Sequence, residues 1–225
     1  MNLLGLNFHG DPNIGLYGKA SDKLCIVGHF ISEESQKKLE KYLKVDVKKG
    51  LIAGTDLIGL FATMNSNGIL LSGLVNDHEL KNFEKIADDY GVNLDIIDSR
   101  FTAIGNLILC NDKGAVVSKL LSKAQMRKIS DCLGVEAVQM KLGGVDVVGS
   151  AGSATNNGCL LHRDSSEKEI ENIQEILKVD ADIGTVNFGS PFVGAGIITN
   201  SYGTLIGDGT TAPEMQRIID SLKLE

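Results

Sequence analysis

Cysteine and histidine are the side chains in this sequence best suited to chemistry, and their spacing limits what they could do. A thiolate beside a histidine is a common nucleophilic pair. His162 follows Cys159 by three residues, and His29 follows Cys25 by four. Side chains alternate across a strand, so positions three apart face opposite ways, and a turn into a helix is expected between Cys25 and His29. We therefore predict that Cys25 and Cys159 are small buried residues.

Motifs for metals and nucleotides are incomplete. Residues 78–82 begin like the zinc motif HExxH but lack its second histidine. Residues 10–15 have the spacing of a phosphate-binding loop, but Leu16 and Tyr17 follow where lysine and serine or threonine are required. Loop carboxylates such as Asp112 are typical turn residues. The sequence therefore predicts no metal, no cofactor and no catalytic group of residues.

Charge and composition narrow the classes of partner. The chain has 225 residues and a net charge of −7. An acidic surface neither displaces counterions from nucleic acid nor favours anionic lipid, so we expect no DNA and no membrane partner, whereas basic proteins remain suitable. We find no signal peptide, no membrane-spanning apolar run and no CxxC pair among the four cysteines. A cytoplasmic protein with reduced thiols is expected.

An internal repeat organises the elements that would position these residues. An apolar residue followed by glycine recurs about every 45 residues, and the repeat glycines are Gly15, Gly59, Gly105, Gly149 and Gly194. A good helix N-cap follows each glycine at a constant distance, at Ser32, Asn76, Ser122, Ser166 and Thr211. In four of the five repeats, a glutamate or glutamine three residues later completes a capping box.

Each repeat is predicted to fold as strand, strand, helix, strand. Residues 107–110 and 115–117 show the hairpin pattern, with Gly114 at the turn, and residues 79–87 show the amphipathic helix. Strands are predicted after the first four helices, at 45–47, 92–97, 135–138 and around 184–186. The fifth repeat ends after its helix, and residues 2–8 stand where its missing strand is expected.

This displaced strand favours a closed architecture. An open solenoid has two ends that need caps, whereas a strand exchanged between the first and last units closes a ring. We therefore predict one domain, residues 1–225, in which five α/β units form a closed ring with a helix outside each small sheet. Two separate α+β domains with accidental spacing are the disfavoured alternative.

One face of this ring is a candidate docking surface. The residues that follow the repeat glycines are small or weakly charged, and they are Leu16, Leu60, Asn106, Ser150 and Ala195. They complete the candidate binding set with Gly15, Gly105 and Asp112. The glycines could equally serve tight packing near the axis, and both roles can hold. The first and third helices are basic, which fits a solvated outer face or, alternatively, contact with acidic partners.

Five segments resemble a known family over essentially the whole chain, and they are residues 13–15, 99–106, 110–112, 147–150 and 184–190. The family is that of archaeal and eukaryotic initiation factor 6, which prevents association of ribosomal subunits. The absence of the eukaryotic C-terminal extension resembles the archaeal members. The resemblance implies a pentein fold, which is a closed five-bladed α/β propeller.

The same resemblance implies a binding function without catalysis. The partner would be the intersubunit face of the large (50S) subunit, near a basic ribosomal protein and the sarcin–ricin loop, with limited contact to ribosomal RNA. A bound monomer would block the small (30S) subunit, and a role in large-subunit maturation is also implied.

Two alternative functions are consistent with a fold of this kind. Arginine deiminases and amidinotransferases are similar in fold and carry their nucleophilic cysteine in the last repeat. Residues 184–225 contain neither cysteine nor histidine, which counts against an arginine-modifying enzyme. A small-molecule sensor that uses the axial cavity is the third possibility, since fold alone does not fix function.

Overall fold

The five repeats fold into five similar units of mixed α/β structure. The computed structural model describes residues 2–224, and in that part of the chain it contains seven α-helices and five three-stranded sheets. The first unit comprises η1 (Ile14–Leu16), β2 (Gly18–Ala20), β3 (Leu24–Gly28), α1 (Glu33–Leu43) and β4 (Asp46–Gly50). The second comprises α2 (Ile58–Phe61), β5 (Ala62–Met64), β6 (Gly68–Ser72), α3 (Asp77–Tyr90) and β7 (Asn93–Ile97).

The remaining three units repeat this order. The third comprises η2 (Ile104–Asn106), β8 (Ile108–Cys110), β9 (Ala115–Val117), α4 (Lys123–Leu133) and β10 (Ala137–Gln139). The fourth comprises α5 (Val148–Ala151), β11 (Gly152–Ala154), β12 (Gly158–His162), α6 (Glu167–Leu177) and β13 (Asp180–Gly184). The fifth comprises η3 (Val193–Ala195), β14 (Ile197–Asn200), β15 (Gly203–Gly207) and α7 (Ala212–Leu222), and its sheet also contains β1 (Leu3–Leu6).

Every sheet has the same topology. The first two strands form an antiparallel hairpin, and the helix returns the chain so that the third strand lies parallel to the second. In the fifth sheet the parallel third strand is β1, with Leu3 opposite Thr204 and Leu6 opposite Gly207. The prediction that the N-terminal segment supplies the strand missing from the last unit is confirmed.

The predicted capping boxes explain where the long helices begin. All four are present, at the N-termini of α3, α4, α6 and α7, and the Ser32 side chain at α1 accepts a hydrogen bond from the Ser35 backbone. Gly91 and Gly134 end α3 and α4 in the left-handed conformation that glycine adopts without strain.

Two features differ from the sequence-based expectation. The strand predicted around 184–186 is instead β13 at Asp180–Gly184, because α6 stops at Leu177 and the left-handed Lys178 turns the chain directly into the sheet. Each repeat glycine also lies within a short helical turn, which the sequence pattern did not indicate.

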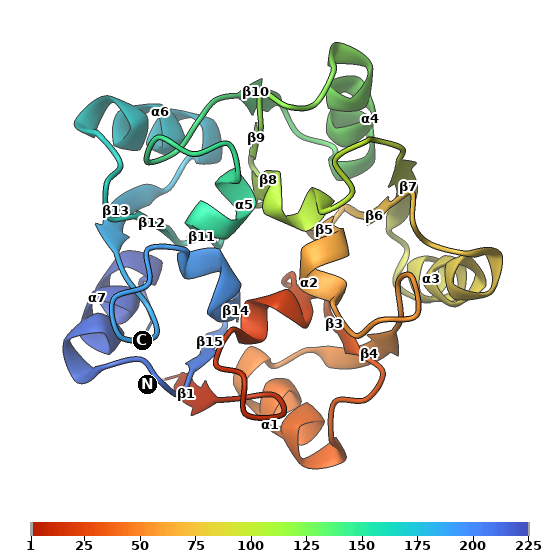
Figure 1. Ribbon diagram of the computed structural model, residues 1–225, viewed down its shortest axis with the longest axis horizontal. Helices are drawn as coiled ribbons and strands as arrows, with labels where there is room; N and C mark the ends of the chain where they lie inside the picture. The colour runs from red at the N-terminus through yellow and green to blue at the C-terminus, as the bar shows by residue number, and fades with distance from the viewer. Residues whose placement is uncertain (1, 225) are drawn as a thin grey trace.

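Figure 1 shows the five units set around a common centre, with the long helices α1, α3, α4, α6 and α7 at the periphery. The first strands of the sheets lie innermost. Each contacts its counterpart in the neighbouring unit, and β14 of the last unit contacts β2 of the first.

The hydrophobic core consists of five clusters that join neighbouring units. In one of them, Leu39 and Leu43 of α1 pack with Ile198 and Leu205 from the last sheet. Burial of apolar surface between units is therefore what holds them together.

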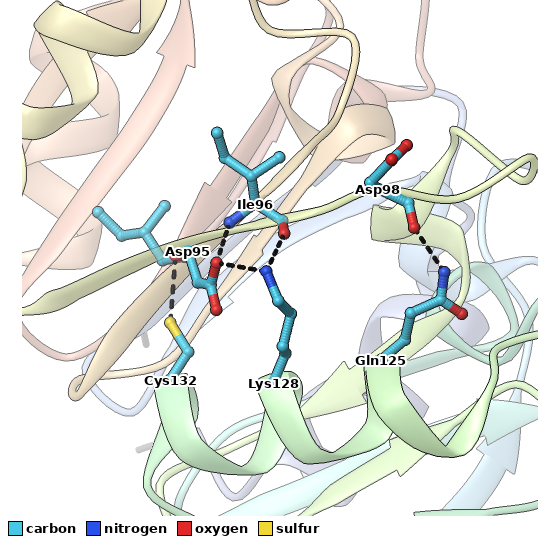
Figure 2. A network of polar contacts seen from close by, with 7 residues as sticks. Asp95, Ile96, Asp98, Gln125, Lys128 and Cys132 are labelled. Atoms are coloured by element: carbon cyan, nitrogen blue, oxygen red, sulfur yellow. Dashed lines mark hydrogen bonds and ion pairs between the residues drawn. The ribbon is translucent and has the colours of Figure 1, made fainter.

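Polar contacts reinforce these inter-unit contacts, as Figure 2 shows for α4 against β7 of the preceding unit. The Lys128 ammonium lies 3.2 Å from an Asp95 carboxylate oxygen and donates to the Ile96 carbonyl at 3.3 Å. The Gln125 amide donates to the Asp98 carbonyl at 2.6 Å. Each long helix therefore lies between the sheet of its own unit and the sheet of the unit before it, and packs against both.

None of the helices within residues 2–224 combines the length and the apolar character needed to cross a membrane.

Candidate docking face

The repeat glycines lie in close contact with one another through their backbones. A Cβ atom on Gly59 would collide with the carbonyl oxygen of Gly15, and the same relation holds from each repeat glycine to the preceding one. The series returns to its start, because a Cβ on Gly15 would collide with the carbonyl oxygen of Gly194. Glycine is required here because five backbones approach one another closely.

The short helical turns that carry these glycines define one face of the molecule, which we call the ring face. Its central residues are 14–16, 58–61, 104–106, 148–151 and 193–195. These turns immediately precede the innermost strands, so they all lie at the same end of those strands (Figure 1). The opposite end carries the hairpin turns, and we call it the hairpin face; its turns are residues 21–23, 65–67, 111–114, 155–157 and 201–202.

Five of the predicted binding residues come together on the ring face. Leu16, Leu60, Asn106 and Ala195 are half-buried, and Ser150 is buried. Gly15 and Gly105, also predicted, lie buried beside them.

Asp112 does not belong to this group, because it lies on the hairpin face between β8 and β9. Its carboxylate accepts hydrogen bonds of 2.7 Å from the Ser66 backbone and hydroxyl and from the Asn156 amide. This agrees with its expected role as a turn residue. The predicted set therefore combined residues from two opposite faces.

Large exposed hydrophobic side chains concentrate on the ring face. In the described part of the chain there are six, and five of them lie in connections at this end: Phe30, Leu74, Leu120, Phe188 and Phe192. The sixth, Tyr202, is on the hairpin face. These side chains come from four separate connections around the same end of the molecule, and on this ground the ring face is the candidate docking face.

Phe188 and Phe30 are the most exposed of these side chains, and neither was among the binding residues predicted from the sequence. Phe188 is 85% exposed and Phe30 is 65% exposed. Phe188 is flanked by Asn187 and Gly189, a turn-forming pair that signals a loop tip in the sequence alone. That signal shows a loop but not that the aromatic ring stays in solvent.

Glutamates at helix N-termini hold the ring-face loops in place. One oxygen of Glu79 accepts the Gly54 backbone N–H at 2.7 Å, and the other accepts the Ala53 N–H at 3.0 Å. Glu214 likewise accepts the Phe188 N–H at 3.2 Å and the Gly189 N–H at 2.8 Å. Each glutamate therefore joins its own helix to the loop of the preceding sheet.

Glu214 is held in its charged form by this arrangement. Burial alone would raise its pKa, but hydrogen bonds from the Thr211 backbone, the Thr185 and Thr211 hydroxyls and the Gly189 backbone outweigh burial and lower the pKa below its usual value.

The cysteines and histidines form no nucleophilic pair in the described residues. Cys25 and Cys159 are fully buried, as predicted, and burial raises the pKa of both thiols far above neutrality. His162 is buried and its Nδ1 accepts the Asp164 N–H at 3.2 Å, while His29 packs edge-on against Phe30. Neither arrangement places an imidazole where it could activate a thiol.

The described residues offer no grouped metal ligands and only a small cavity among the innermost strands. Within residues 2–224, no three His, Cys, Asp or Glu side chains are grouped so that they could hold a metal ion. A small cavity of about 50 Å³ lies among the innermost strands, lined by residues that include Lys19, Thr63, Cys110 and Ser153. Burial lowers the pKa of Lys19, because a buried site is unfavourable for its positive charge.

Comparison with known proteins extends over the whole fold. The model of the eIF-6 family matches residues 3–221. The chain is 38% identical over 226 residues to Translation initiation factor 6 of Pyrococcus abyssi, which covers 100% of both chains. It is 37% identical over 224 residues to the protein of the same name from Pyrococcus horikoshii, and 36% identical over 223 residues to that of Saccharolobus islandicus, with 99% of each chain covered.

Proposed function

The chain belongs to the eIF-6 family, as the sequence resemblance predicted, and from this premise we propose that it binds the large (50S) ribosomal subunit and prevents the small (30S) subunit from joining. The relatives are named as translation initiation factors, which supports a role in translation. A further role in maturation of the large subunit is part of the proposal.

We propose that the five units form a closed five-bladed α/β propeller of the pentein type, folded as one domain over residues 1–225. Contacts between neighbouring units support closure, since they return from Gly194 to Gly15 and from β14 to β2. The placement of β1 in the last sheet supports it as well, because this strand ties the first unit to the last.

The ring face is the proposed contact surface, through Gly15, Leu16, Leu60, Gly105, Asn106, Ser150 and Ala195. The observation that carries this choice is that five of the six large exposed hydrophobic side chains in residues 2–224 lie at this end. A standard protein interface removes about 800 Å² from each partner. That is less than a tenth of the 9467 Å² surface of the molecule, so one face is sufficient.

The proposed partner surface is basic protein on the intersubunit side of the 50S subunit, near the sarcin–ricin loop, with limited contact to ribosomal RNA. The net charge of −7 supports a basic protein rather than nucleic acid as the main contact. A monomer bound there in the cytoplasm would act by steric exclusion, with no covalent step and no cofactor.

An arginine-modifying enzyme is the less favoured alternative. In the described residues the fully buried Cys25 and Cys159 have raised pKa values, and the last unit has no cysteine or histidine in its sequence. Both observations favour binding over catalysis.

Sedimentation of purified subunits through a sucrose gradient tests the proposal. The protein is expected to migrate with 50S subunits and to reduce the amount of joined 70S ribosomes in proportion to its occupancy. Unchanged 70S formation, with no protein in the 50S fractions, would show that the proposed function is wrong.

A further inference from the structure

We propose that Phe188 is a pre-positioned aromatic anchor that inserts into an apolar pocket, surrounded by basic residues, on the protein surface that the ring face covers. This inference rests on the proposed function and adds to it the residue on which affinity depends.

The connection from β13 to η3 is unlike its counterparts. Three of the four corresponding connections make tight turns closed by isolated bridges, with two residues between the bridged positions. The fourth, from β7 to η2, lies within the described residues and has no such bridge. The turn closed by Val186 and Ser190 places three residues there, Asn187, Phe188 and Gly189. The additional residue lengthens this loop and gives it an aromatic tip.

Phe188 has a backbone conformation that a phenylalanine rarely adopts. The φ angles of Asn187, Phe188 and Gly189 are 51°, 62° and 99°, so three consecutive residues are left-handed. Asparagine and glycine tolerate this region, but for a bulky residue it is strained. Strain of this kind persists where the surroundings enforce it, and it occurs preferentially at functional sites.

Hydrogen bonds on both sides of Phe188 enforce the conformation. Glu214 accepts the Phe188 and Gly189 N–H groups, at 3.2 and 2.8 Å. The Asn187 N–H donates to the Thr210 hydroxyl at 3.2 Å, and the Asn187 side chain donates to the Pro12 carbonyl at 2.9 Å. The loop is thus attached to α7 and to the first unit.

The ring nevertheless has little contact with its own molecule, since Phe188 is 85% exposed. Phe192 lies four residues further along the same connection and is 38% exposed, so it would offer the partner a second apolar side chain. A rigid, exposed aromatic side chain loses little conformational entropy on binding and buries a large apolar area, which are the properties of an interface hot spot.

The chemistry around the loop indicates the pocket that would receive this ring. The pocket must be apolar to accept a phenyl group. Its surroundings are expected to be basic, because Glu214 beneath the loop is held charged and the molecule carries a net charge of −7.

Equilibrium binding of fluorescently labelled protein to purified 50S subunits tests the inference, with thermal unfolding of each variant as a second readout. We expect Phe188→Ala and Phe188→Gly to raise Kd at least tenfold, and Phe188→Leu to retain more affinity than Phe188→Asp. Phe188→Gly is also expected to unfold at the same or a higher temperature, because glycine relieves the left-handed strain. Tyr202→Ala removes an exposed aromatic from the hairpin face and is expected to leave Kd within twofold.

The anchor would be overturned if wild-type protein binds and Phe188→Ala and Phe188→Gly bind with a Kd within twofold of it. The proposed function would then remain intact. A lower unfolding temperature for Phe188→Gly would overturn the strained, pre-positioned loop. Failure of the wild-type protein to bind 50S subunits would overturn both the function and the anchor.

Discussion

At the scale of single residues, the ring face has closely packed glycine backbones at its centre and solvent-exposed side chains in the surrounding loops. Asn106 stands between these two zones, half-buried in the turn η2 directly after the repeat glycine Gly105. Substitutions there change the surface without entering the core, so they report on binding rather than on folding.

The substitution Asn106→Arg is expected to weaken 50S binding at least tenfold, which corresponds to about 1.4 kcal/mol. Arginine adds bulk and positive charge against a partner surface proposed to be basic. Asn157→Arg makes the same change on the hairpin face and is expected to leave binding unaltered. Equal binding by both variants would mean that the ring face is not the docking face.

Gly59 tests the close approach of backbones at the centre. The substitution Gly59→Ala is expected to lower the free energy of unfolding by at least about 3 kcal/mol, at the upper end of overpacking penalties, because the Cβ would collide with the Gly15 carbonyl. Gly5→Ala is the matched control, since its Cβ would lie 3.7 Å from the nearest atom, Cα of Asp208. Urea unfolding measures the free energy of unfolding of both variants. Similar decreases in the two would contradict the close approach of backbones at the repeat glycines.

The sequence predicted residues well where a repeat position specifies them. It indicated the glycines, the caps and the burial of Cys25 and Cys159. It placed Asp112 in the same candidate binding set as the ring-face residues, although the turn after strand 107–110 lies at the opposite end of that strand from Gly105. It missed Phe188 because solvent exposure of an aromatic residue depends on what the neighbouring units leave uncovered.

At the scale of elements, asparagines at three of the five hairpin turns attach their sheet to the helix of the next unit, and they are Asn65, Asn111 and Asn200. The Asn111 amide donates to the Leu177 carbonyl at the end of α6 at 2.9 Å and to the Thr155 carbonyl at 3.0 Å. Asn65 makes the equivalent bond to the Leu133 carbonyl at the end of α4, at 2.9 Å. The last helical carbonyls, which lack partners within the helix, are thereby satisfied.

Replacing one of these buried amides by an isosteric carboxylate should be costly. Asn111→Asp is expected to lower the free energy of unfolding by about 2–4 kcal/mol, because two donors are lost and an acceptor then faces two carbonyl oxygens. The same change at exposed Asn157 is expected to cost about 0.5 kcal/mol. Equal unfolding midpoints in urea for the two variants would show that the asparagine contacts do not stabilise the junctions.

Glu214 gives the junction between α7 and the loop at 187–189 a pH dependence. The pKa of Glu214 is lowered in the native state. Its ionised carboxylate therefore contributes to the free energy of unfolding in full above the unfolded-state pKa of about 4.3, and this contribution is lost as pH falls through the native-state pKa. Thermal unfolding of wild type and Glu214→Gln is therefore expected to differ most at neutral pH and to converge in acid. A difference that is constant with pH would mean that ionisation of Glu214 does not stabilise the fold.

Helix N-termini were the most predictable elements, because a capping box is a local signal. Strand limits were less predictable. The end of α6 moved β13 toward the N-terminus, and only backbone geometry shows that Lys178 is left-handed. The helical turns around the repeat glycines were missed because close contact between units, rather than local preference, stabilises them.

At the scale of the whole molecule, each unit contributes an element to the packing of its neighbour. Each long helix packs on the preceding sheet, and β1 completes the last one. The sequence predicted this strand exchange from repeat spacing alone, since a truncated fifth repeat and an unassigned first strand complement each other. It could not choose between the two faces, because both carry one equivalent segment from every unit.

The choice of face also determines how the molecule would exclude the small subunit. Docking through the ring face leaves the hairpin face, with its turns at 111–114 and 155–157, directed away from the 50S subunit. The exposed surface would then be polar and hydrogen-bonded, as at Asp112, and unsuited to a second apolar contact.

Amide hydrogen exchange of the protein, free and bound to 50S subunits, tests the central claim most directly. The ring-face loops at 29–30, 53–54 and 187–189 are expected to gain protection on binding, while the hairpin turns at 21–23, 111–114 and 201–202 keep their exchange rates. Protection confined to the hairpin turns would contradict docking through the ring face, and unchanged exchange at every site would contradict binding itself.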